Sequence, residues 1–172
     1  ANNPEQQVPI AFGTQVATRS VVESDKEGMD NFTLWGWVRE SDGPKLFFDA
    51  ASVTPSGNYG EKRFWAVGRP YDFFALHPEK MKEEGIAAEV SCNDKGELRV
   101  TGFDSSGMGK DAVDLMTATE TDVTYEGGGT MAPVLLAFKH ELAQVKLTVR
   151  TGEKLAEVSD IRLFGVDYKG DL

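Results

Sequence analysis

The stretch Val134-Leu-Leu-Ala-Phe-Lys-His-Glu-Leu-Ala-Gln-Val-Lys-Leu-Thr-Val149 decides the fold class, because two alternating runs meet in it out of phase. The inward positions carry even residue numbers in the first run and odd numbers in the second. They are Leu136, Phe138 and His140, then Val145, Leu147 and Val149. Since side chains alternate between the two faces of a strand, the chain must kink or bulge within residues 141–144 to keep one apolar face inward. This sequence of strand, corner and strand predicts a β-sandwich core.

Short alternating segments with turn residues between them recur along the chain. The expected strands cover residues 8–14, 31–39, 45–48, 61–67, 71–76, 87–91, 98–103, 114–118, 134–140, 144–150 and 157–166. Asn93-Asp-Lys-Gly96 is a typical hairpin turn between two of them. A helical turn or two is expected only over residues 78–85, which have Pro at the start and Gly at the end. The sequence thus predicts an all-β fold with at most one short helix.

Composition excludes several classes of partner. The 28 acidic and 18 basic residues give a net charge of -10, which repels nucleic acid phosphates. The longest stretch without a charged or polar side chain, residues 131–138, is far shorter than the ~20 residues of a membrane span, so the chain as given is expected to be soluble. The start Ala1-Asn-Asn-Pro4 is interpreted as a mature or trimmed end from which an export leader has been removed.

The residues that usually carry catalysis or bind metals form no recognisable site. Cys92 is a single cysteine in a polar segment, and it is interpreted as an ordinary thiol beside a turn. His77 and His140 lie in different strand-like segments without metal-ligand spacing. No nucleophile, base and stabilising donor stand together, so no enzyme activity, cofactor or metal is expected.

Aromatic residues concentrate between residues 32 and 74, and two interpretations of them remain open. In the first, alternate members share a sheet face and form the core of the sandwich. In the second, exposed rings form a platform for sugars, as in a surface lipoprotein domain that binds glycans. The residues are Phe32, Trp35, Trp37, Phe47, Phe48, Tyr59, Phe64, Trp65, Tyr71, Phe73 and Phe74.

Four stretches have sequences that are more specific than any of these patterns. They are Phe64-Trp-Ala-Val-Gly-Arg-Pro70 with Tyr71-Asp-Phe-Phe-Ala-Leu-His-Pro78, then Asp114-Leu-Met-Thr-Ala118, then Phe138-Lys-His-Glu-Leu-Ala143, then Val158-Ser-Asp-Ile-Arg-Leu-Phe-Gly165. In this order they resemble the fimbrillin family of Bacteroidales-type surface fimbriae, the type V pilus subunits and fimbrillin-like surface lipoproteins. The resemblance covers the chain from about residue 32 to its end.

The resemblance implies a fold and a structural activity. Residues 20–172 would form a transthyretin-like β-sandwich of about seven main strands with antiparallel, Greek-key connections, the N-terminal domain of a fimbrillin whose C-terminal domain is absent from this chain. Such subunits are exported lipoproteins of the outer membrane and the fimbrium. They lose an N-terminal strand to an arginine-directed protease and polymerise when a partner's strand fills the vacated groove, which supports adhesion.

The resemblance also implies the kinds of partner. They would be other fimbrial subunits, as a homopolymer or with accessory subunits, and a host or bacterial surface ligand. Contact with the membrane is expected only through a lipid anchor that this sequence does not include. Stalk, anchor and tip roles all remain open.

Residues 1–19 contain what strand removal needs. Val8, Ile10 and Phe12 alternate with smaller residues, so this face could pack on the sandwich as a removable edge strand. Arg19 follows in a polar segment and is the candidate cleavage site. The alternative is an ordinary first strand followed by a loop arginine. The residues expected to form the core and groove are Trp35, Trp37, Trp65, Phe73, Leu136, Phe138, Val145 and Leu147.

Overall fold

A computed structural model describes residues 7–16, 29–104, 114–141 and 169–170. These ranges contain strands and turns but no helix, so the predicted all-β class is confirmed, and the arrangement is consistent with a β-sandwich. The strands are β1 Phe12–Val16, β2 Phe32–Glu40, β3 Gly43–Val53, β4 Pro70–His77, β5 Glu89–Cys92, β6 Leu98–Thr101, β7 Phe103–Asp104, β8 Met116–Thr124, β9 Val134–His140 and β10 Lys169–Gly170.

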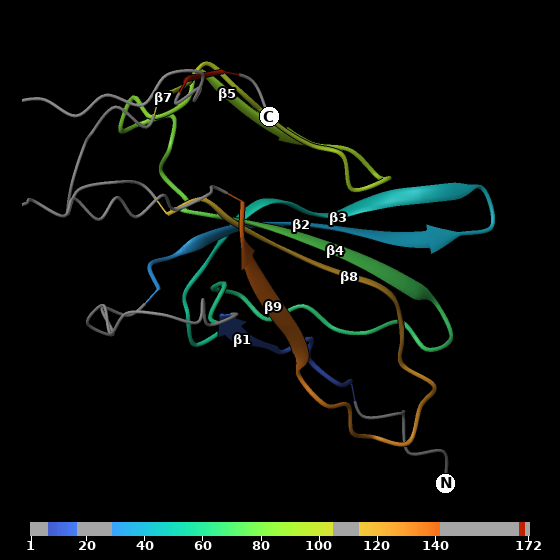
Figure 1. Ribbon diagram of the computed structural model, residues 1–172. Helices are drawn as coiled ribbons and strands as arrows, with labels where there is room; N and C mark the ends of the chain where they lie inside the picture. Colours follow the sequence, from blue (N-terminus) through green and yellow to red (C-terminus); the bar gives the residue numbers. More distant parts are fainter. Residues whose placement is uncertain (1–6, 17–28, 105–113, 142–168, 171–172) are drawn as a thin grey trace, which may run out of the picture.

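Six strands form the main sheet in the order β1-β9-β8-β4-β2-β3, while β5 pairs with β6 and β7 with β10. The pairs are antiparallel, as predicted, except that β1 runs parallel to β9. β8 and β9 share only two residue pairs, Met116 with His140 and Thr117 with Lys139. β9 therefore diverges from β8 beyond this pairing. In Figure 1 it lies with β1 on one side of β2, β3, β4 and β8, and β5 and β7 lie on the other side.

The central strand β2 is buried on both faces because apolar side chains cover the sheet from either side. One cluster, here the β1-side cluster, comprises Val8, Ile10, Phe12, Phe32, Leu34, Val38, Phe48, Val53, Trp65, Tyr71, Phe73, Ala75, Met116, Ala118, Tyr125, Val134, Leu136 and Phe138. The other, the β5-side cluster, comprises Trp35, Trp37, Phe74, Leu76, Met81, Ala87, Val100, Phe103 and Leu115. Alternation along β2 sends Leu34 to the first cluster and Trp35 to the second.

Local turn chemistry explains the ends of several strands. The hairpin between β5 and β6 turns at the predicted Asn93–Gly96 position, where the Asn93 side-chain oxygen accepts hydrogen bonds from the amides of Lys95 (3.0 Å) and Glu97 (2.9 Å). Residues 79–85 form turns rather than a regular helix. They close at Gly85, which has a φ of 71°, and the amide of Ile86 donates to the carbonyl of Met81 at 2.7 Å.

The expectation of a strand over residues 61–67 is wrong. This segment makes only an isolated bridge, Pro9 with Phe64. The apolar residues that suggested a strand do not share one environment. Trp65 is buried, whereas Phe64 remains 38 % exposed. The segment runs along residues 8–10 and turns away at Gly68, whose φ is 75°.

An ion pair between the exposed Arg39 and the buried Asp72 links three strands of the main sheet. The guanidinium of Arg39 on β2 donates to both carboxylate oxygens of Asp72 on β4 at 2.9 and 2.7 Å. The amide of Asp122 on β8 donates to the same carboxylate at 2.9 Å. Burial alone would raise the pKa of Asp72, but these hydrogen bonds and the Arg39 charge outweigh it and lower the pKa below its ordinary value of 3.8. The ionised carboxylate therefore stabilises the fold.

Asp72→Asn is expected to lower the free energy of unfolding at pH 7 by about 1 to 2 kcal/mol, because it removes the charged acceptor of two Arg39 hydrogen bonds and leaves Arg39 only its exposed contact with Asp122. Since the folded pKa lies below the unfolded one, the contribution of Asp72 is complete above about pH 4 and is lost as the pH falls further. Urea denaturation between pH 3 and 7 should thus show a difference in unfolding free energy between parent and variant that becomes smaller as the pH falls. Asp94→Asn, which removes an exposed carboxylate, should show no such difference.

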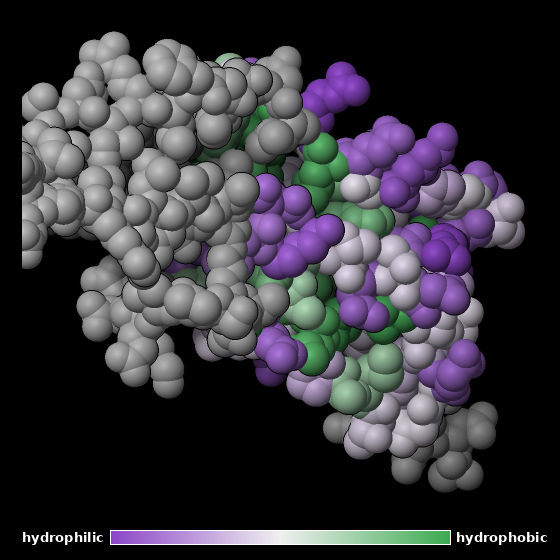
Figure 2. All heavy atoms as spheres, viewed as in Figure 1, coloured by the Kyte–Doolittle hydropathy of each residue, from purple (hydrophilic) through white to green (hydrophobic). Residues whose placement is uncertain are grey.

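The surface seen in Figure 2 is mixed. Hydrophilic side chains cover the end of the molecule where the β2–β3 hairpin lies, and hydrophobic ones come to the surface nearer the middle. The large apolar side chains that stay exposed are Val16, Leu46, Phe64, Val67 and Leu135. No helix within the described part of the chain is long and apolar enough to cross a membrane.

Candidate functional site: the seat of the N-terminal strand

The N-terminal strand runs between two backbone partners. On one side Ile10 donates its amide to the carbonyl of Arg63 at 2.8 Å, and Trp65 donates its amide to the carbonyl of Val8 at 3.0 Å. On the other side the amide of Val134 donates to the carbonyl of Ala11 at 2.7 Å. From there residues 12–16 pair in parallel register with residues 134–138 of β9. The chain from residue 8 to 16 is thus held at both of its backbone edges.

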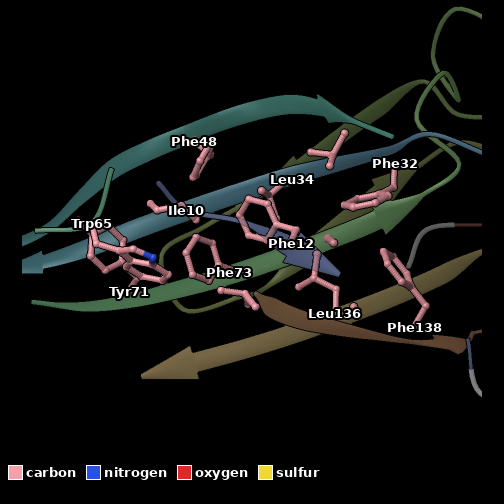
Figure 3. Packing of buried hydrophobic residues seen from close by; sticks show 14 of the residues in the cluster. Ile10, Phe12, Phe32, Leu34, Phe48, Trp65, Tyr71, Phe73, Leu136 and Phe138 are labelled. Atoms are coloured by element: carbon pink, nitrogen blue, oxygen red, sulfur yellow. The ribbon is translucent and has the colours of Figure 1, made fainter. Parts of the chain in front are cut away.

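The side chains of this strand alternate as the sequence predicts. Val8, Ile10 and Phe12 are buried in the β1-side cluster, whereas Ala11 is exposed. The Phe12 ring packs edge to face on three other rings. The distances between ring centres are 5.8 Å to Phe48, 5.6 Å to Tyr59 and 5.3 Å to Phe73. Figure 3 shows Phe12 close to Phe73, with Ile10 and Leu136 nearby. We call the surface that residues 8–16 cover the β1 seat.

Residues 54–65, here called the strap, form one wall of this seat. Its turn is held by hydrogen bonds between residues 54 and 58, including one of 2.9 Å from the amide of Thr54 to the carbonyl of Asn58. The Tyr59 hydroxyl donates to the carbonyl of Ile10 at 2.5 Å, and the Thr14 hydroxyl donates to the carbonyl of Pro55 at 2.8 Å. The strap therefore bonds to the N-terminal strand through backbone carbonyls and side-chain hydroxyls, besides the ring contact of Tyr59 with Phe12.

Two glycines make room for this arrangement. Gly57 in the strap has a φ of 88°, and a Cβ there would lie 2.1 Å from the carbonyl oxygen of Phe12. Gly36 on β2 faces the seat, where a Cβ would lie 2.9 Å from the Phe48 ring and 3.2 Å from the Phe73 ring. Because both positions lack a Cβ, the strap can approach the strand backbone and the ring cage around Phe12 can close.

The predicted core and groove residues divide between the two faces. Phe73, Leu136 and Phe138 belong to the β1-side cluster, as does Trp65, whose amide bonds to the N-terminal strand. Trp35 and Trp37 are buried on the opposite face and do not line the seat. Val145, Leu147 and Arg19 lie outside the described residues, and so does the predicted corner beyond residue 141.

Sequence reasoning missed the residues that enclose the strand. Tyr59 and Phe48 were visible only as members of the aromatic concentration, and Gly57 only as part of a turn. Gly36 stands between two tryptophans, and this interruption of a bulky alternation is the one local signal of a close approach.

The remaining candidate residues are built into the fold. His77 and His140 both approach Asp114: His77 Nδ1 lies 2.9 Å from its carbonyl oxygen and His140 Nδ1 lies 2.6 Å from its carboxylate. Nowhere in the described ranges do three or more His, Cys, Asp or Glu side chains gather as metal ligands would. Burial raises the pKa of the Cys92 thiol to about 12, so it carries little thiolate at neutral pH.

Most of the aromatic residues are core, as the first interpretation holds. All three tryptophans are buried, and so are Phe32, Phe48, Tyr71, Phe73 and Phe74. A shallow hollow of about 470 Å³ has Phe47 and Phe64 in its lining. The Arg63 guanidinium stacks on the Phe47 ring there, 3.7 Å from its centre, and covers one face of that ring.

Comparison with known proteins gives one match. No curated protein and no solved structure matches the chain significantly. The family model described as fimbrillin-like matches residues 18–172, which is most of the sequence and begins just after β1. It agrees with the all-β fold and with the family wording noted in the sequence. The chain belongs to the fimbrillin-like family.

Proposed function

We propose that this chain is an exported structural subunit of cell-surface fimbriae that assembles by strand complementation. Removal of the N-terminal strand would vacate the β1 seat, and an extended segment of a neighbouring subunit would fill it. The observation that carries the proposal is the packing of Val8, Ile10 and Phe12 from an edge strand into the main apolar cluster. The role of these three residues as an assembly strand remains a prediction.

The geometry of the seat supports exchange rather than permanent attachment. Within the main sheet β1 pairs with β9 alone, so its removal breaks no central pair and otherwise costs the bonds of residues 8 and 10 to the strap. Its pairing with β9 is parallel, which is slightly weaker per residue than antiparallel pairing. Leaving exposes three apolar pockets, each worth about 1.5 to 3 kcal/mol when filled, so an empty seat favours a new strand.

The family supports the coarser parts of the proposal. A fimbrillin-like chain implies a structural pilus subunit, assembly with other fimbrial subunits and a place in a cell-surface appendage. The outer membrane location, lipidation outside this sequence, adhesion to a surface ligand and the transthyretin-like relationship remain predictions. So does the division into an arm over residues 1–19 and a domain over 20–172, although the family match from residue 18 is compatible with it.

The alternatives differ in their support. An anchor or tip subunit would use the same seat while keeping the N-terminal strand or lacking a donor, and nothing in the described residues separates these roles from a stalk subunit. A glycan-binding lipoprotein domain would need exposed aromatic faces. Trp35 and Trp65, its best candidates, are 5 % and 7 % exposed, so this alternative gains no support from the fold.

Digestion of the folded chain with an arginine-specific endoprotease is expected to cut after Arg19 and leave a resistant core. Mass spectrometry of the fragments identifies the cut, and electron microscopy of the digest tests for polymers. Arg19→Lys is the matched control, because it keeps the positive charge but removes the cleavage site. It should retain the arm and remain monomeric. Polymers formed equally well by Arg19→Lys would contradict the processing step.

A further inference from the structure

We infer that the β1 seat chooses its occupant by one aromatic anchor, the side chain at the position of Phe12. The partner it fits is an extended segment with two apolar residues at alternate positions and a phenylalanine at the next. This inference rests on the proposed strand complementation and names the chemistry of the incoming strand.

Most contacts in the seat cannot distinguish one sequence from another. The bonds at Val8, Ile10 and Ala11 use their backbone atoms, with partners from Arg63, Trp65 and Val134. The Tyr59 hydroxyl likewise donates a hydrogen bond to a backbone carbonyl, that of Ile10. Any extended chain in the same register could make these bonds, so they provide affinity without selectivity.

Directional side-chain contacts occur at Phe12. Its ring touches three other rings edge to face, and these come from β3, the strap and β4. The Phe48 and Phe73 rings also approach each other at 6.2 Å, so the cage is closed around the anchor. Gly36 beneath it leaves the space that these rings fill. Val8 and Ile10 are buried in the same cluster, but their aliphatic side chains have no ring to pack edge to face.

A shorter side chain at the anchor position would leave a cavity that three separate segments would have to collapse to fill. Cavities of this kind, opened by removing an aromatic side chain from a well-packed site, are among the largest losses that single substitutions cause. The seat should therefore discriminate strongly at this one position and only weakly at Val8, whose side chain is smaller.

The test uses the full chain with a recognition site for a sequence-specific protease inserted between residues 16 and 29, so that it does not depend on Arg19. This chain also carries Phe12→Ala, which weakens the binding of its own N-terminal strand to the seat. After folding and cleavage, an added peptide can then displace that strand. Fluorescent peptides with the sequence of residues 8–16 are added, carrying Phe, Leu or Ala at the anchor, or Ala in place of Val8. Fluorescence anisotropy gives the Kd of each.

The Phe peptide is expected to bind with one site per chain, the anchor Ala peptide at least 100-fold more weakly, and the Leu peptide in between. The Val8→Ala peptide should lose roughly 10-fold or less. Equal binding of the Phe and Ala peptides would overturn the anchor but leave strand complementation standing. Absence of binding by every peptide to a chain that remains folded would overturn both.

Discussion

Phe12→Asp is expected to lower the free energy of unfolding of the uncleaved chain by about 4 kcal/mol or more. The substitution removes a ring that is 5 % exposed and packed against three others, and it places a carboxylate among them. Removing a buried phenylalanine alone destabilises proteins by about 3 to 5 kcal/mol, and a charge without a partner adds to that. The three rings around this position carry no charge that could pair with the new carboxylate.

The matched control is Ala11→Asp, on the same strand with the same added charge. Ala11 is exposed, so its replacement should change the unfolding free energy by less than about 1 kcal/mol. Urea denaturation measures both variants. Amide hydrogen exchange distinguishes the two ways in which Phe12→Asp can act. Local release of the strand would raise exchange in residues 8–16 alone, whereas a loss of global stability would raise it throughout the chain. Unchanged melting together with unchanged exchange would show that the strand is not held by its buried face.

Local patterns predicted the strands and turns whose own residues signal them. β2, β4 and β9 each concentrate bulky apolar residues within seven to nine positions, and each was placed within a residue or two of its observed bounds. Asn93–Gly96 was predicted as a hairpin turn because its side-chain and glycine chemistry acts within a few residues. The burial of Val8, Ile10 and Phe12 followed from the same alternation.

The enclosure of the N-terminal strand could not be predicted because it depends on contacts between distant segments. Pro55-Ser-Gly-Asn58 consists of residues that favour turns, but no local pattern says that this turn lies on Phe12, some forty positions earlier. Residues 61–67 have the apolar content of a strand, yet their partner is the short segment 8–10, which supports a bridge and two hydrogen bonds only. The parallel direction of β1 against β9 is likewise set by chain path, not by composition.

Gly57→Ala is expected to destabilise the chain by about 3 kcal/mol, the largest effect of any methyl-sized change in the strap. About 1 kcal/mol comes from the φ of 88°, which an L side chain adopts poorly. The rest comes from the new Cβ, which would lie 2.1 Å from the Phe12 carbonyl oxygen and must push the strap and the strand apart. Thermal and urea denaturation measure the sum.

Gly60→Ala isolates the second term. Gly60 has nearly the same φ, 92°, but an added Cβ meets nothing within 4 Å, so only the backbone penalty of about 1 kcal/mol should appear. Equal losses at Gly57 and Gly60 would mean that the strap does not press on the strand in solution.

A double-mutant cycle then links the strap to occupancy of the seat. In a Phe12→Asp background, where the strand is already displaced, the collision with its carbonyl disappears and Gly57→Ala should lose only the backbone penalty. The interaction energy of the pair is thus expected at about 2 kcal/mol, whereas Gly60→Ala with Phe12→Asp should be additive. Additivity at both glycines would place Gly57 away from the occupied seat. Coupling at Gly57 alone would make it a reporter of whether a strand, its own or another subunit's, lies beneath the strap.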